Sequence, residues 1–109
     1  MKVMLWGAGG NAKLYLKMLE ENFKNDFIIT GIFENRLKSI PFKTNSPICR
    51  TKNELSLLIN KSTHFVISIG SNGLARYEIS RQLKNKGLKS VNLISNHSIL
   101  EDLNKYGEG

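Results

Sequence analysis

The sequence predicts an α/β fold, a small Rossmann-like open parallel sheet of about four to five strands flanked by helices. Three observations lead to this prediction. Short apolar segments alternate with segments whose apolar residues recur at helical spacing. A glycine-rich turn, residues 7–10, separates the first strand from the first helix. The chain has 109 residues, which is enough for one domain with one modest core and too few for two.

The first half of the chain contains two predicted strands and the helix between them. Residues 2–6 form a short apolar strand that ends at the glycines. From Asn11 onward, apolar residues recur at the spacing of one helix face, which predicts a helix. The polar residues 22–26 are expected to end it. The β-branched and aromatic run 27–33 predicts the second strand. Residues 37–46 have no clear period and contain a proline, so they predict a loop.

The middle of the chain predicts a short helix followed by the most apolar strand. Residues 47–49 form a short strand or an extended segment. Thr51 followed three residues later by Glu54 predicts a capping box at the start of a helix. The β-branched run 64–69 then predicts a central strand.

The last predicted helix covers residues 71–86, and Gly87 is expected to end it as a C-cap. A final strand is expected over residues 89–94, and the signals in residues 95–109 are weak. The apolar residues of the helix that are expected to face the core are Leu74, Ile79 and Leu83.

The charge of the chain favours anionic partners but indicates no nucleic-acid site. The formal net charge is +7 and the isoelectric point is about 9.7. The lysines are scattered and no aromatic residues interleave with them, so we expect solvated helix faces and no nucleic-acid partner. No apolar stretch approaches the roughly 20 residues of a membrane span. A cytoplasmic protein is therefore expected.

Residues with catalytic or metal-binding chemistry are few. Cys49 is the only cysteine, so an internal disulfide and a cysteine-based zinc site are excluded, and we expect a structural or surface role for it. The two histidines, His64 and His97, lie far from Cys49 in the sequence. No Ser/His/Asp set, paired carboxylates or metal-ligand spacing is present. We therefore assign no catalytic residue and no metal ligand.

The glycine-rich turn is the strongest functional signal. Residues 7–12, Gly-Ala-Gly-Gly-Asn-Ala, fit the pattern G-x-G-x-x-(G/A) between a strand and a helix. Gly7 allows the tight turn, Gly9 lets a phosphate approach the backbone, and Ala12 allows the helix to pack closely on the strand. The start of the helix adds N–H groups and partial positive charge that favour an anion. Gly10 and Asn11 belong to the same candidate site.

Two further segments are expected at the same edge of the sheet, because the carboxyl ends of parallel strands meet there. Glu34 and Asn35 follow the second strand, where a carboxylate commonly accepts hydrogen bonds from a ribose or a base. Gly70 and Asn72 follow the central strand, and Arg76 lies in the early turns of the next helix. Arg76 reaches a phosphate or faces water, and the sequence leaves both open.

These segments, taken in order, resemble a known family. Residues 1–10, 30–35, 65–72 and 91–94 are similar to the N-terminal domain of the NeuD/PglD-type sugar acyltransferases. The resemblance covers nearly the whole chain. It implies that residues 1–105 form a Rossmann-like module that holds a nucleotide-linked sugar of the UDP or dTDP type. Residues 106–109 are then expected to begin a left-handed β-helix.

The resemblance also implies what the complete enzyme does. In that family the β-helix binds acetyl-CoA and supplies a histidine base, and the acetyl group passes to the sugar in bacterial surface-glycan or glycoprotein assembly. The catalytic β-helix is expected to be absent from this chain, so the domain alone binds no cofactor and performs no chemistry. A homotrimer is expected only where the β-helix is present.

Two other functions remain open from the sequence. The glycine pattern with Glu34 also suits an NAD(P)-type dinucleotide-binding module. A non-catalytic interaction domain, whose lysine-rich surface binds acidic partners, is the third possibility.

Overall fold

A computed structural model of the chain describes residues 1–9, 11–69 and 73–91. Strands and helices alternate along it, as the sequence predicts, except that the second strand is followed by a third strand with no helix between them. The elements in chain order are β1 (Lys2–Trp6), α1 (Ala12–Phe23), β2 (Ile28–Phe33), β3 (Ile48–Cys49), α2 (Lys52–Lys61), β4 (His64–Ile67), α3 (Gly73–Asn85) and β5 (Lys89–Ser90).

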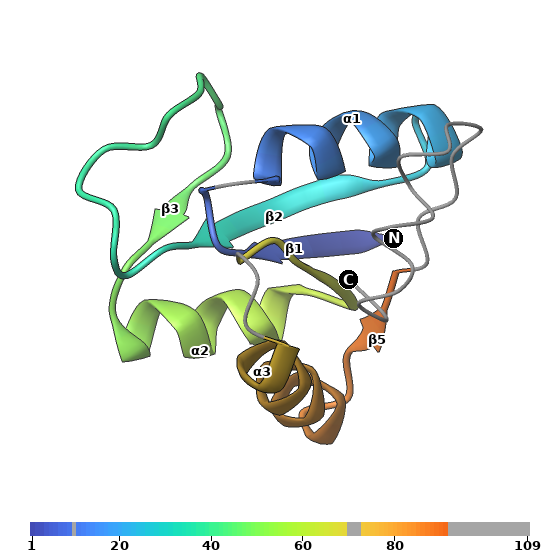
Figure 1. The fold of residues 1–109 in the computed structure, drawn as a ribbon. Helices are drawn as coiled ribbons and strands as arrows, with labels where there is room; N and C mark the ends of the chain where they lie inside the picture. The colour runs from blue at the N-terminus through green and yellow to red at the C-terminus, as the bar shows by residue number, and fades with distance from the viewer. Residues whose placement is uncertain (10, 70–72, 92–109) are drawn as a thin grey trace.

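The strands form one parallel sheet in the order β3-β2-β1-β4-β5 (Figure 1). Helix α1 covers one face of the sheet, and α2 and α3 cover the other. The predicted α/β class, with an open parallel Rossmann-like sheet of about four to five strands, is therefore confirmed. The chain leaves β1 toward β2 on one side and later returns to place β4 on the other. This reversal of strand order lies between β1 and β4, where ligands of open α/β sheets bind.

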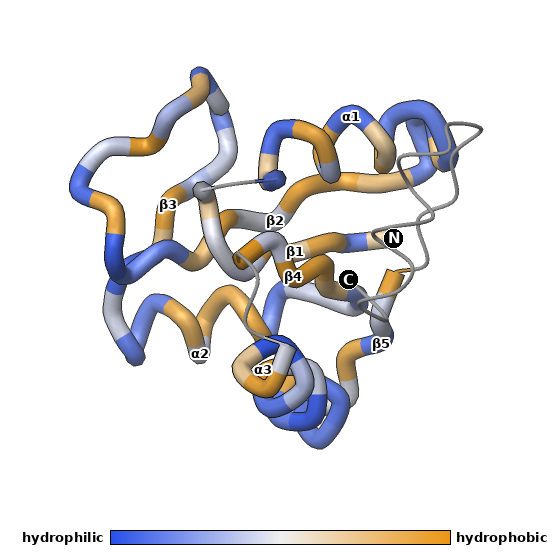
Figure 2. The backbone as a smooth tube through the Cα atoms, viewed as in Figure 1, coloured by the Kyte–Doolittle hydropathy of each residue, from blue (hydrophilic) through white to orange (hydrophobic). Residues whose placement is uncertain are grey.

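The sheet divides the interior into two apolar layers, and β1 contributes to both. Val3 and Leu5 pack beneath α1, whereas Met4, which points to the opposite face, packs with α2 and α3. All three side chains are completely buried. Figure 2 shows the central strands as the most hydrophobic part of the backbone, with alternating colours along the helices.

Both sequence signals for helix ends are confirmed. The Thr51 hydroxyl accepts the N–H of Glu54, and the Glu54 carboxylate accepts the N–H of Thr51, which completes the capping box of α2. At the end of α3, Gly87 has a φ of +93°. The N–H of Gly87 donates to Lys84 O and that of Leu88 to Leu83 O, which together form a Schellman motif.

One residue predicted to face the core points outward. Leu74 is 70% exposed, whereas Leu83 is buried and Ile79 is partly buried against the same cluster. Arg76 is buried on α3 and only 6% exposed. Residues two apart on a helix differ by about 200° in direction, so Leu74 and Arg76 cannot both face inward. The possibility that Arg76 faces water is thereby excluded.

Gly31 in β2 brings α2 close to the sheet. A Cβ atom on Gly31 would lie 2.8 Å from Leu58 Cδ1 and 3.2 Å from Pro47 O. Leu58 is the buried residue of α2. The absence of a side chain at Gly31 therefore sets the spacing between this helix and β2.

Candidate functional site

The turn after β1 lies beside the turns that follow β2 and β4. The N–H of Gly7 donates to Phe33 O, the last carbonyl of β2, at 2.7 Å. The Gly7 carbonyl accepts the hydroxyl of Ser68, which follows β4. Three strand ends are thus joined at the edge of the sheet where the strand order reverses.

Gly7 adopts the tight turn that the sequence predicts. Its φ is +103°, a conformation that residues with a Cβ atom rarely adopt. A Cβ atom here would also lie 2.8 Å from Ile69 Cγ2 and 3.1 Å from Ile69 N. Both the backbone conformation and the close approach of the β4 segment therefore require glycine.

Glu34 lies at the end of β2, as predicted, and its carboxylate accepts three backbone N–H groups. Oε1 accepts Ala8 N at 2.8 Å, across to the turn after β1. Oε2 accepts Arg36 N at 2.8 Å and Leu37 N at 3.1 Å, within the turn after β2. Glu34 is only 7% exposed. The side chain therefore fastens two loops of the candidate site to each other.

These contacts keep the Glu34 carboxylate charged. Burial raises its pKa, but the three N–H bonds and the nearby charge of Arg50 together outweigh burial and lower the pKa below the ordinary value. A negative charge thus lies beside the Ala8 amide. A ligand group that donates a hydrogen bond suits this corner better than a phosphate does.

Arg50 and Ser68 support the site, and sequence reasoning assigned a site role to neither. The Arg50 guanidinium donates to the carbonyls of Leu37 and Lys38, the latter at 3.0 Å, and so holds the β2–β3 loop. Ser68 is completely buried and its hydroxyl donates to Gly7 O. The available signals were a basic residue directly after β3 and a polar residue at the end of an apolar strand.

The other predicted site residues take different positions. Gly9 lies next to Leu37, whose Cδ1 atom would be 3.2 Å from an added Cβ atom. Asn11 is the exposed N-cap residue of α1 and makes no side-chain capping bond, and Asn35 is exposed. Arg76 is buried on α3. Gly10, Gly70 and Asn72 lie outside the described residues, as do residues 92–109.

Besides the amide of Gly7, two further amides of the segment 7–12 are already used by the protein. Ala8 N–H donates to Glu34, and Ala12 N–H donates to Gly9 O at 3.2 Å. An anion at the start of α1 must therefore use other donors of the turn. Ala12 itself is buried against the α1 face of the sheet, which is the close packing expected from its small size.

The described residues contain no group of three histidine, cysteine or acidic side chains that could hold a metal ion. Cys49 is a half-buried free thiol, and burial together with the charge of Glu54 raises its pKa. Such a thiol is a poor nucleophile at neutral pH. Among the same residues, no helix is both long and apolar enough to cross a membrane.

A family model, the PglD N-terminal domain, matches residues 2–83 of the chain. The chain belongs to the PglD N-terminal domain family. This family forms the N-terminal domain of sugar acetyltransferases, and the resemblance seen in the sequence is confirmed. The matched PglD segment runs from the start of β1 into the last turn of α3, so it includes the glycine turn, Glu34 and Ser68. Comparisons with curated proteins and with solved structures found no significant match.

Proposed function

We propose that this domain binds a nucleotide-linked sugar, of the UDP or dTDP type, for a bacterial sugar acetyltransferase. The complete enzyme would act in the cytoplasm on precursors of surface glycans or glycoproteins. The domain recognises the substrate, and a hexapeptide β-helix supplies acetyl-CoA and the catalytic base. We assign no catalytic residue to this chain.

One structural observation supports the proposal in addition to family membership. The turn after β1 is fixed from both sides, by Glu34 and Phe33 O after β2 and by Ser68 after β4. A turn that is already rigid loses little conformational freedom when a ligand binds, so more of the interaction energy appears as affinity. Its place at the reversal of strand order is where nucleotides bind in such sheets.

The contacts of Glu34 leave it one further role in binding. A carboxylate offers about four lone-pair positions. Three backbone N–H groups already use three of them. The fourth suits a single donor, such as a ribose hydroxyl or a base N–H. In this proposal Gly7, Gly9 and Gly10 line the nucleotide, with Asn11 at the helix start.

The remaining site residues complete the far side of the ligand. Asn35 lies beside Glu34 in the loop after β2. Gly70 and Asn72 are assigned to the opposite wall, and Arg76 to the phosphates. Arg76 is buried on α3, so it would reach a phosphate only from within the domain.

Isothermal titration calorimetry of the chain with UDP-, dTDP-, GDP- and CMP-sugars and with NAD tests the proposal. We expect saturable heat with a UDP- or dTDP-sugar and none with NAD. Binding of NAD without any nucleotide sugar would instead favour a dinucleotide-binding module. The absence of heat with every ligand would contradict both and favour an interaction domain.

Gly9 provides the matched variants. An alanine there meets only the flexible end of Leu37, so Gly9→Ala keeps the fold, and its single methyl group should weaken binding less than a large side chain does. Gly9→Phe places a large side chain on the turn, and we expect it to weaken sugar-nucleotide binding at least about tenfold. Equal affinity of the two variants would show that the ligand binds elsewhere.

A further inference from the structure

A groove of about 420 Å³ lies between α2 and α3, on the face of the sheet opposite α1. Its base is apolar and consists of Trp6 from β1, Leu55 and Ile59 from α2, and Leu83 from α3. Its volume falls within the range of small-molecule sites. The groove is therefore large enough for a compact organic ligand.

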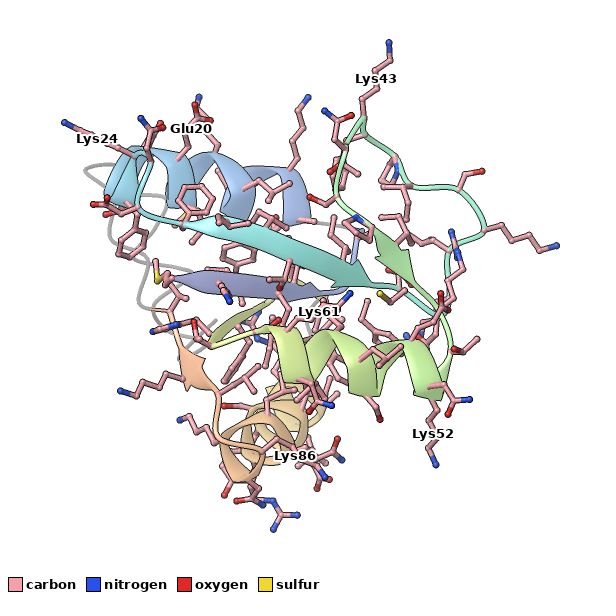
Figure 3. The ribbon with its side chains drawn as sticks, turned by 180° about the vertical axis from the view of Figure 1, so that it is seen from behind. Glu20, Lys24, Lys43, Lys52, Lys61 and Lys86 are labelled. Carbon is pink, nitrogen blue, oxygen red and sulfur yellow. The ribbon has the colours of Figure 1, made fainter. Side chains whose placement is uncertain are left out.

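The rim of the groove is basic. Lys52 at the start of α2 and Lys86 just after α3 both line it. The other polar lining groups are neutral amides and one hydroxyl, and none of the described lining residues is acidic. Figure 3 shows both lysines in the helix layer on the same side of the sheet. A ligand here meets positive charge above an apolar floor.

Trp6 offers a firm aromatic surface at this floor. Its ring packs against Phe33 with centroids 4.7 Å apart and planes inclined by 58°. This contact holds the indole in place, and Trp6 is partly exposed and lines the groove, so its ring can contact a ligand there. Trp6 belongs to the apolar layer beneath α2 and α3, whereas Ala8 and Ala12 of the glycine turn belong to the layer beneath α1. The groove and the start of α1 are thus on opposite faces of the sheet.

We propose that the α2–α3 groove binds a compact aromatic anion, with its ring on Trp6 and its carboxylate, sulfonate or phosphate between Lys52 and Lys86. Charge complementarity selects an anion over a neutral ligand of the same shape. The apolar floor selects a ring over a fully hydrated ion such as free phosphate. This site is separate from the nucleotide site proposed above and does not depend on it.

The chain contains a single tryptophan, and Trp6 lines the groove, so its emission follows dye binding, while the variants described below show whether the dye occupies the groove. Titration with 8-anilinonaphthalene-1-sulfonate, an aromatic sulfonate, should quench the Trp6 emission to saturation by energy transfer at one site. The neutral N-phenyl-1-naphthylamine should bind at least about tenfold more weakly. Equal affinity for the two dyes would overturn the proposal, as would the lack of saturation.

Two double variants with the same total charge separate a local site from general attraction to a basic protein. In Lys52→Glu/Lys86→Glu both charges at the groove are reversed, and dye affinity should fall at least about tenfold. In Lys24→Glu/Lys43→Glu the reversed charges lie on the other side of the sheet (Figure 3), and affinity should stay within about twofold. Equal losses in both variants would overturn the proposal.

Two further measurements test whether the dye occupies the groove of the folded protein. Ser56 also lines the groove, and Ser56→Phe should fill it and abolish the quenching. A UDP-sugar at saturating concentration should leave the dye bound, and its displacement would place the dye in the nucleotide site instead. Urea unfolding in the presence of dye should remain cooperative, which would show that the dye binds the folded protein. Dye binding to a partly unfolded state would overturn the proposal.

Discussion

The Glu34 carboxylate accepts the backbone N–H of Ala8 at 2.8 Å and so joins the end of β2 to the turn after β1. The two residues are 26 positions apart in the chain. Because the same carboxylate also accepts two amides of its own loop, one buried side chain couples the glycine turn to the loop after β2. An acidic residue at this position therefore builds the site in addition to any contact with a ligand.

Glu34→Gln should destabilise the domain by about 1–3 kcal/mol at pH 7. The amide keeps one acceptor oxygen and replaces the other with an NH₂ donor, so at least one backbone N–H loses its partner. Urea denaturation followed by circular dichroism measures the loss. Glu21→Gln, at an exposed position on α1, is the matched control and should change stability by less than about 0.5 kcal/mol.

The difference in stability between wild type and Glu34→Gln should depend on pH. The folded pKa of Glu34 is lowered, so the stability it contributes is present above its ordinary pKa of about 4.3 and is lost as pH falls through the folded value. The stability gap between wild type and Glu34→Gln should therefore narrow below about pH 4. A gap that is constant from pH 7 to pH 3 would contradict this role for the charge.

Gly7→Ala and Gly9→Ala should differ sharply in stability. Gly7 has φ +103° and an added Cβ atom would contact the β4 segment, so we expect a loss of about 2 kcal/mol or more. Gly9 has room for a methyl group once the end of Leu37 shifts slightly, so Gly9→Ala should lower the stability by less than about 1 kcal/mol. Thermal unfolding of both variants measures the difference. Similar midpoints would mean that the turn does not have this geometry.

Gly31→Ala should loosen the packing of α2 on β2. The new Cβ atom would lie 2.8 Å from Leu58 Cδ1, so the helix must shift, at a cost of about 1–3 kcal/mol. Gly73→Ala is the matched control, because nothing lies within 4 Å of its Cβ position on α3. We expect the control to be neutral or slightly stabilising in chemical denaturation. Destabilisation of equal size in both would exclude a steric origin.

The imidazole of His64 should titrate below the usual value near 6.5. Burial lowers its pKa, and the positive charges of the N-terminus and of Lys89 lower it further. Proton NMR of the ring measures the midpoint, and a His97→Gln variant assigns the signal. Lys89→Gln should raise the midpoint, whereas Lys52→Gln should not. Because the unfolded state binds the proton more tightly, stability should rise with pH through the region just below 6.5.

The order and type of the elements could be predicted from sequence because local patterns determine them. The capping box at Thr51 and the C-cap at Gly87 are examples, since each depends on residues only a few positions apart. The strand predicted for residues 64–69 ends at Ile67 in the structure, and the helix predicted to reach residue 86 ends at Asn85. Ends of elements depend on hydrogen bonds to neighbouring strands, which local patterns do not contain.

The side chains that support the site were harder to predict. A periodic pattern favoured Leu74 over Arg76 as an inward residue, but the helix places the arginine inside. The bonds of Glu34 to Ala8 and of Ser68 to Gly7 join residues 26 and 61 positions apart. Such contacts follow from the register of the sheet. The sequence therefore indicated where Glu34 lies but not which backbone amides donate to its carboxylate.

The central place of β1 also affects how the protein folds during synthesis. Val3 pairs with His64, which the ribosome adds about sixty positions later. At typical rates of 5–20 residues per second, this takes roughly 3 to 12 seconds. During that interval β1 lacks its partner strand β4, so the apolar run Val3-Met4-Leu5 cannot be buried in the complete sheet until β4 has been added.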